Sequence, residues 1–270
     1  MIICKDYESL QRARSHMHEQ EQSLAFVPTM GALHDGHISL VELAKTKAAK
    51  VAVSIFVNPT QFAPHEDFDS YPRDIESDLK KLEKAGVALV YLPQEHDIYP
   101  HGKALTVKAG KQAKGLESDF RPHFFDGVTT VVKTLFDQVR PQIAIFGEKD
   151  YQQLLVISEM VQNEGLDIQI IGAPIARDEF GLALSSRNAY LSSDELEIAR
   201  MLNQVLYKAA YDISEKRDEN EALSEANQNL LAAGFDKIDY FSVRGHRVLC
   251  AAWLGKTRLI DNTEIPKSLK

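Results

Sequence analysis

Residues 24–57 read LAFVPTMGALHDGHISLVELAKTKAAKVAVSIFV, and this stretch decides the fold. Its first four residues are apolar and predict a short buried strand, and apolar residues then recur at helical spacing over 38–48. Residues 51–57 form an almost wholly apolar, β-branched run, which is typical of a strand covered on both faces. Strand, helix and strand in this order make a βαβ unit, which favours a parallel sheet with a right-handed crossover.

The same alternation continues through the first two thirds of the chain. In chain order we expect a helix over 75–85, a strand over 87–92, a helix within 127–139, a strand over 143–146, a helix ending near Gly165 and a last strand over 167–172. This order predicts an α/β fold with a Rossmann-like, doubly wound parallel sheet.

The pattern changes after Pro174. Ser192 and Glu195 have the spacing of a capping box and predict a long helix that ends near Ile213. A second helix is expected over 219–233, and short strands are expected around 238–243 and 257–262. We therefore predict two domains, 1–174 and a smaller α+β C-terminal domain over 175–270.

Composition excludes several classes of protein. The chain has 270 residues, and its 31 Lys and Arg against 39 Asp and Glu give a net charge of −8, so binding of nucleic acid through overall charge is not expected. Cys4 and Cys250 match neither a disulfide framework nor a metal-ligand spacing, which favours a reducing, cytoplasmic setting. No apolar run reaches the roughly 20 residues of a membrane span or has the form of a signal peptide. We expect a soluble, unprocessed protein with no membrane partner.

Three polar segments directly follow predicted strands. They are PTMGALHDGH at 28–37, NPTQF at 58–62 and GEKD at 147–150. In an open parallel sheet ligands bind beyond the carboxyl ends of the strands. These segments are therefore the candidates for a binding site.

The first segment has the features of an anion site. Gly31 and Gly36 allow backbone to approach a ligand closely, and the following helix directs its free N–H groups at that place. His34 and His37 lie three residues apart on one side of the helix start and can reach the same phosphate, as neutral donors or as imidazolium. They could equally form a hydrogen-bonded pair at a helix cap. As zinc ligands they lack a third partner, and HExxH is absent, so a metalloenzyme is the weakest alternative.

Two further segments carry cations. Lys149 stands at a strand end, where a mobile cation suits a triphosphate, although an exposed lysine in a turn would look the same. In LALSSRN, residues 182–188, two hydroxyls beside Arg187 suit phosphate oxygens. The alternative for this segment is a polar helix-entry loop with Arg187 in a salt bridge.

Taken together, these segments resemble the pantothenate synthetase family, the ligases of pantoate and β-alanine within the HIGH-motif nucleotidyltransferase superfamily. The resemblance runs through PTMGALHDGH, SIFVNPTQF, YPRD, GVTTVVKTLF, FGEKDYQQL and LALSSRN, in the family's order over residues 24–190. The rest of the chain is compatible with the family's C-terminal domain in length but carries no quotable motif.

The resemblance implies ATP-dependent condensation of (R)-pantoate with β-alanine to pantothenate through a pantoyl adenylate, with release of AMP and pyrophosphate. It also implies Mg²⁺, a homodimer, a C-terminal lid and partners that are small-molecule substrates. Two alternatives remain. One is a nucleotidylyltransferase that stops at adenylyl transfer, and the other is a non-catalytic adenine-nucleotide sensor.

The resemblance assigns roles residue by residue. The catalytic residues that it implies are His34, His37, Lys149 and Arg187, with His37 at the position of the family's catalytic histidine. The residues that it assigns to ATP are Met30, Gly31, Ala32, Leu33, His34, Asp35, Gly36, His37, Gly147, Glu148, Lys149, Asp150, Ala176, Leu184, Ser185, Ser186 and Arg187. Those that it assigns to pantoate and β-alanine are Asn58, Gln61 and Gln153, and its candidate metal ligand is Asp78.

The chain also departs from the family pattern. Residues 121–126 read RPHFFD where RPGHF is expected, so Phe124 stands at a histidine position and His123 precedes it. Phe180 stands where an acid is common, and Leu184 replaces a methionine. We expect different packing around the nucleotide at these positions.

Overall fold

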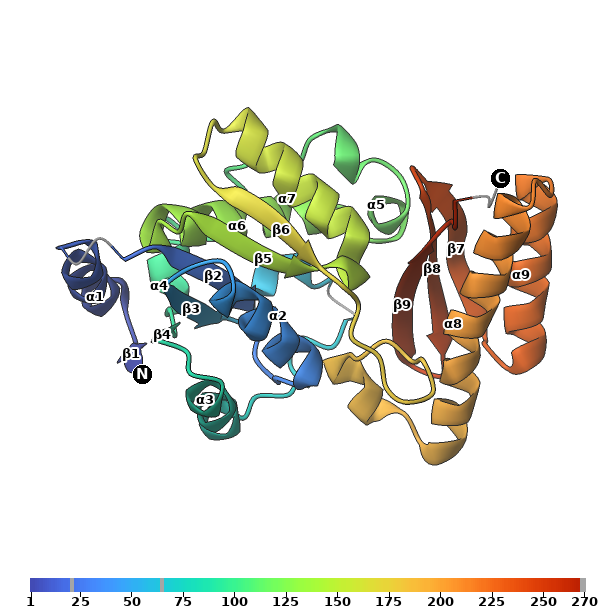
Figure 1. The fold of residues 1–270 in the computed structure, drawn as a ribbon, viewed down its shortest axis with the longest axis horizontal. Helices are drawn as coiled ribbons and strands as arrows, with labels where there is room; N and C mark the ends of the chain where they lie inside the picture. Colours follow the sequence, from blue (N-terminus) through green and yellow to red (C-terminus); the bar gives the residue numbers. More distant parts are fainter. Residues whose placement is uncertain (20–21, 64–65, 268–270) are drawn as a thin grey trace. The chain divides into compact units, whose positions relative to one another are not determined.

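The first two thirds of the chain form a six-stranded sheet in which each recorded strand pairing is parallel (Figure 1). The computed structural model describes residues 1–19, 22–63 and 66–267. Within them the strands are β1 (Ile2–Cys4), β2 (Leu24–Thr29), β3 (Lys50–Ile55), β4 (Leu89–Tyr91), β5 (Ile143–Gly147) and β6 (Gln169–Ala173). Their order, β1-β4-β3-β2-β5-β6, reverses its direction between β2 and β5. Such a reversal is where open α/β sheets bind ligands.

Helices cover both faces of this sheet (Figure 1). On one face, α1 (Tyr7–Glu19), α6 (Phe124–Val139) and α7 (Tyr151–Asn163) pack against Leu24 and Phe26 of β2. On the other face, α2 (Asp35–Lys45) and α3 (Ile75–Lys84) pack against Ala25 and Val27. Successive residues of β2 thus enter opposite cores, which explains why the strand is apolar throughout.

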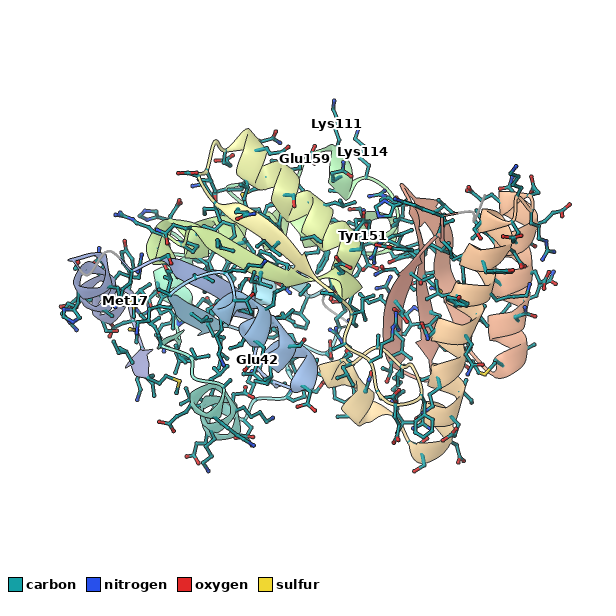
Figure 2. All side chains as sticks on the ribbon, in the orientation of Figure 1. Met17, Glu42, Lys111, Lys114, Tyr151 and Glu159 are labelled. Atoms are coloured by element: carbon teal, nitrogen blue, oxygen red, sulfur yellow. The ribbon has the colours of Figure 1, made fainter. Side chains whose placement is uncertain are left out.

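Short helices complete this unit. They are η1 (Pro59–Gln61), α4 (Glu95–Ile98), η2 (Lys111–Ala113), α5 (Glu117–Phe120) and η3 (Glu148–Asp150). Glu159 on α7 accepts the backbone N–H groups of Lys111 and Gln112 at 3.0 and 2.8 Å, which fastens η2 beside α7 (Figure 2).

The chain divides into two compact units, Met1–Pro174 and Ile175–Lys270. The second contains η4 (Ser186–Tyr190), α8 (Ser193–Ser214), α9 (Glu219–Ala233) and an antiparallel sheet of β7 (Lys237–Arg244), β8 (Arg247–Leu254) and β9 (Thr257–Glu264). Leu206 of α8 and Leu230 of α9 pack into one core with Cys250 of β8. The ligand-binding and lid roles given to the two predicted domains stay predictions.

The structure confirms the predicted fold class, an α/β unit with a parallel sheet and a smaller α+β unit. The capping box is present, because Ser192 Oγ accepts the N–H of Glu195 and Glu195 Oε2 accepts that of Ser192. β1, α1 and β8 were not predicted. β1 is only three residues long, and the apolar run of β8 reads as a strand only once the flanking turns at Gly245 and Gly255 are recognised.

No helix in the described part of the chain has the length and apolar character needed to cross a bilayer.

Candidate active site

The carboxyl ends of three neighbouring strands bring the predicted segments together. β2 pairs with β3 on one side and β5 on the other, all parallel. The segments that follow these strands, 30–34, 56–62 and 147–150, therefore leave the sheet at the same edge, as the sequence analysis expected.

A tight loop after β2 is held by a buried carboxylate. Asp78, on α3 and 1% exposed, accepts the N–H of Ala32 at 2.9 Å and that of Leu33 at 2.8 Å. Lys81, one turn later, donates to the carbonyl oxygen of Leu33 at 2.5 Å. Gly31 and Ala32 both have positive φ, +81° and +51°. A Cβ on Gly31 would lie 2.9 Å from a methyl carbon of Ile55, so this loop depends on glycine in two ways.

The contacts of Asp78 indicate a structural role in the loop after β2. Burial raises the pKa of its carboxyl, and the bonds from the Leu33 and Ala32 N–H groups and the charge of Lys81 oppose that rise. Each of its two oxygens accepts one backbone N–H group. Among the residues that the structure describes, no three His, Cys, Asp or Glu side chains gather as metal ligands. The geometry thus supports a positioning role for Asp78, and its role as a metal ligand stays a prediction.

The two histidines cap α2. His34 is the N-cap residue, and its Nδ1 accepts the N–H of Gly36 at 3.1 Å. His37 Nδ1 accepts the N–H of His34 at 3.3 Å, and the ring centroids are 4.2 Å apart. The alternative of a hydrogen-bonded pair at a cap is therefore realised, but only through the Nδ1 atoms. The Nε2 atoms are not used by the cap.

Both imidazoles are neutral near pH 7. Loss of solvation lowers the pKa of His34 to about 4, with the charge of Lys149 as the next cause. The same loss lowers the pKa of His37 to about 3, followed by the effects of His34 and Lys149. Because each Nδ1 accepts a bond, each ring carries its proton on Nε2 and presents an N–H donor there. Of the two forms that the sequence allowed, the structure favours the neutral one over imidazolium.

Lys149 supplies the positive charge beside these donors. It lies in η3, directly after β5, and its Nζ is 3.5 Å from Asp150 Oδ2. Its charge contributes to lowering the pKa of both His34 and His37. Glu148 and Gly147 belong to the same strand-end segment.

Asn58 and Gln61 form one cluster with Met30. Asn58 is 1% exposed, and its Nδ2 donates to Gln61 Oε1 at 3.1 Å. Gln61 Nε2 contacts Met30 Sδ at 3.1 Å. This cluster joins the segment after β3 to the one after β2.

Gln152 and Gln153 are neighbours in α7 but differ in burial and in hydrogen bonding. Gln152 is buried and bonds the backbone of Gln112, Gly115 and Glu117, so it holds that segment in place. Gln153 is partly exposed, and its carboxamide makes no recorded hydrogen bond within residues 1–19, 22–63 and 66–267. The substrate-binding role of Gln153 stays a prediction.

The remaining predicted residues lie in the second unit. The N–H of Leu184 donates to the carbonyl oxygen of Ala176 at 2.9 Å, and Ser185 Oγ caps η4 by accepting the N–H of Arg187 at 3.3 Å. Arg177 anchors the segment through a two-bond contact with the buried Asp261, at 2.6 and 2.9 Å. A role of Ala176, Leu184, Ser185, Ser186 and Arg187 in nucleotide binding stays a prediction.

The altered segment 121–126 has its own contacts. His123 precedes α6 with φ +68°, and the Arg121 guanidinium lies 3.8 Å from the centre of the Phe124 ring. Arg121 also bonds Glu66 through two nitrogens and donates to the carbonyl oxygen of Gln61 at 3.0 Å. Sequence reasoning did not single out Arg121 as a support of the Gln61 loop.

Fold and site together define a class, the HIGH-motif nucleotidyltransferases, in which two histidines open a helix at the switch point of a parallel sheet. The chain belongs to the pantoate–β-alanine ligase family, whose model matches residues 2–264. This finding confirms the resemblance and identifies the family as one of enzymes.

Named relatives and solved structures agree. The chain is 52% identical to the pantothenate synthetase of Mesorhizobium japonicum over 90% of each chain, and 46% identical to that of Rhodopseudomonas palustris over 98% of each. It is similar to the crystal structure of pantothenate synthetase from Thermus thermophilus, with a TM-score of 0.90, 40% identity and coverage of 98% and 99% of the two chains. It is also similar to pantoate–β-alanine ligase from Francisella tularensis in complex with β,γ-ATP and β-alanine, with a TM-score of 0.88, 38% identity and 98% coverage of each chain.

The first prediction concerns Asp78. In Asp78→Asn an NH₂ group replaces one acceptor, so one backbone N–H of the loop loses its bond, and we expect a loss of about 1–3 kcal/mol in the free energy of unfolding. Urea denaturation measures this loss. Glu159→Gln is a matched control, because Glu159 also accepts two successive N–H groups but in a loop away from the histidines. An Asp78→Asn variant as stable as the wild type would contradict the assignment.

The second prediction concerns pH. Since the folded pKa values of His34 and His37 lie below the value near 6.5 of an unfolded chain, the unfolded state binds more protons between about pH 6.5 and 4. Folding stability should therefore fall as the pH is lowered through this range. In ¹⁵N NMR spectra, both rings should remain the Nε2–H tautomer from pH 8 to 5.5. Titration of either ring in that interval would refute the neutral assignment.

Proposed function

We propose that the protein catalyses the ATP-dependent condensation of (R)-pantoate with β-alanine to pantothenate, with release of AMP and pyrophosphate. One observation carries the proposal: two neutral imidazole donors open α2 at the carboxyl edge of the sheet, and Lys149 follows the neighbouring strand β5 at the same edge. The chain's family and the ligands named for the Francisella tularensis structure support it.

The start of α2 suits the phosphates of ATP. The helix directs its partial positive charge at an anion, and the Nε2–H groups of His34 and His37 supply two donors. Lys149 adds the full positive charge that a triphosphate needs. Segments 30–37 and 147–150 thus form the ATP site of this proposal.

In the first step, a carboxylate oxygen of pantoate attacks the α-phosphorus of ATP, and the bond from that phosphorus to the β-phosphate oxygen breaks. Pyrophosphate leaves with the bonding electrons, and pantoyl adenylate forms. Negative charge grows on the phosphate oxygens during this step. His37, His34 and Lys149 stabilise that charge because they are already in place, without reorganisation of solvent.

In the second step, the amine of β-alanine attacks the acyl carbon of the adenylate. The bond from the acyl carbon to the phosphate oxygen breaks, AMP leaves, and the nitrogen gives up a proton. An amide results. The adenylate makes this step feasible, because AMP is a far better leaving group than the oxide of a free carboxylate.

Pantoate presents two hydroxyls and a carboxylate, which call for both donors and acceptors. Gln61 and Gln153 offer both without adding charge, and Asn58 lies directly behind Gln61. We assign the pantoate pocket to these carboxamides.

Several parts of the proposal rest on the family resemblance alone. They are a cytoplasmic homodimer and a lid made by the second unit, in which Leu184 to Arg187 and Ala176 contact the nucleotide. Mg²⁺ is expected to arrive with ATP. Among the described residues no three His, Cys, Asp or Glu side chains gather as ligands for it, and no step here runs through the metal.

The third prediction removes His37. His37→Ala should fold but lose roughly 10²- to 10³-fold in turnover, because it lacks one preorganised donor to the developing charge. His37→Gln, which retains an N–H donor, should recover part of the loss. His96→Ala is the control, since His96 is largely exposed on α4. Near-normal turnover in folded His37→Ala would remove His37 from the mechanism.

The fourth prediction separates the alternatives. With ATP and Mg²⁺, pantoate alone should drive exchange of labelled pyrophosphate into ATP, and addition of β-alanine should yield the amide. Exchange without amide formation would indicate a nucleotidylyltransferase. Nucleotide binding with neither reaction would indicate a sensor.

A further inference from the structure

Two hydroxyls converge on the buried Asn58, behind the proposed pantoate pocket. The hydroxyl of Tyr99, directly after α4, donates to Asn58 Oδ1 at 2.5 Å. The hydroxyl of Thr60 lies 3.0 Å from the same oxygen and 2.9 Å from the Tyr99 hydroxyl. The proposed mechanism uses neither Tyr99 nor Thr60.

These contacts determine which way each carboxamide is turned. Because Oδ1 of Asn58 receives the hydroxyl donors, its Nδ2 must face the other side, where the acceptors are Gln61 Oε1 at 3.1 Å and the carbonyl oxygen of Gly127 at 3.4 Å. Gln61 Oε1 is then engaged, so Gln61 Nε2 is the atom beside Met30 Sδ. The hydroxyls therefore set the orientation of the Asn58 carboxamide, and that carboxamide sets the orientation of Gln61.

Burial and close packing hold this network of hydrogen bonds in place. Asn58 and Tyr99 are buried, and η1 packs closely on α6, where a Cβ on Gly127 would lie 2.7 Å from the carbonyl oxygen of Thr60. Burial raises the pKa of the Tyr99 hydroxyl, so it remains a neutral donor at working pH. On the far side, Arg121 holds the backbone of Gln61 through its carbonyl oxygen.

We propose that Tyr99, together with Thr60, is a positioning residue that sets the orientation of the Gln61 carboxamide through Asn58 and thereby tunes recognition of the hydroxy acid. The inference rests on the proposed function. The Gln61 carboxamide has one lone pair engaged by Asn58 and one hydrogen engaged by Met30, so it meets its ligand with a defined donor and a defined acceptor. The N–H of Thr60 also donates to Asn58 Oδ1, at 3.3 Å, so the hydroxyls strengthen an orientation that this longer bond already favours. With the hydroxyls removed, that preference is weaker, and part of the Gln61 population presents the wrong atom.

The test is a series of variants, Tyr99→Phe, Thr60→Val and the two combined, with steady-state kinetics for all three substrates. The combined variant should raise the KM for pantoate about tenfold, since a hydrogen bond between the Gln61 carboxamide and pantoate is lost or misdirected. The single variants should give smaller increases in the same direction. The KM values for ATP and β-alanine should stay within about twofold of the wild type, because the ATP segments keep their own supports.

The matched control is Tyr91→Phe. Tyr91 is also buried, and its hydroxyl also donates to a side-chain amide oxygen, Gln138 Oε1 at 2.8 Å, but away from Asn58. This variant therefore measures the effect of losing a buried tyrosine hydrogen bond while the contacts of Asn58 and Gln61 are unchanged. Tyr91→Phe should lower the unfolding midpoint without changing the KM for pantoate.

A second background tests the route through Gln61. In Gln61→Ala, adding Tyr99→Phe should not raise the KM for pantoate further, because the residue that Tyr99 orients is gone. An unchanged KM in the combined Tyr99→Phe and Thr60→Val variant, an equal rise for all three substrates, or additive effects in Gln61→Ala would overturn the inference. Wild-type protein that forms no pantothenate would instead refute the proposed function, and this inference with it.

Discussion

The site depends on the left-handed turn at Gly31 and Ala32. Asp78 holds this turn by accepting two successive backbone N–H groups, and Lys81 holds the carbonyl oxygen that follows. After this turn, His34 has the backbone conformation of the N-cap residue of α2. A carboxylate is costly to bury, and here the cost is offset by the bonds that shape the loop. Catalytic geometry at the start of α2 is therefore set from α3, a neighbouring helix.

Charge and hydrogen bonding are divided between different residues at this edge of the sheet. The capping bonds consume Nδ1 of both histidines and leave neutral Nε2–H donors, while Lys149 provides the full charge. Neutral N–H donors stabilise negative charge as it develops. Because they carry no positive charge, they do not repel the ammonium group of Lys149. The carboxamides of Asn58 and Gln61, in the pantoate pocket that we propose, would likewise contact polar groups while adding no charge.

The sequence predicted the parallel sheet and the three strand-end segments, because apolar runs and the switch-point rule are local patterns. It could not reveal Asp78 as the support of the loop, because that contact joins residues 46 positions apart and depends on how α3 packs. The protonation of the histidines was also open, since it follows from burial and from bonds to backbone. β8 was missed because its apolar run lacks the alternation of an exposed strand, being the central strand of its sheet.

The central claim is that the start of α2 holds the triphosphate through the two imidazoles and Lys149. A crystal structure of the protein with a non-hydrolysable ATP analogue and pantoate tests it most directly. The account predicts phosphate oxygens within hydrogen-bond distance of His34 Nε2 and His37 Nε2, with Lys149 beside them and pantoate against Gln61. A triphosphate bound elsewhere, or imidazoles turned away from it, would contradict the account.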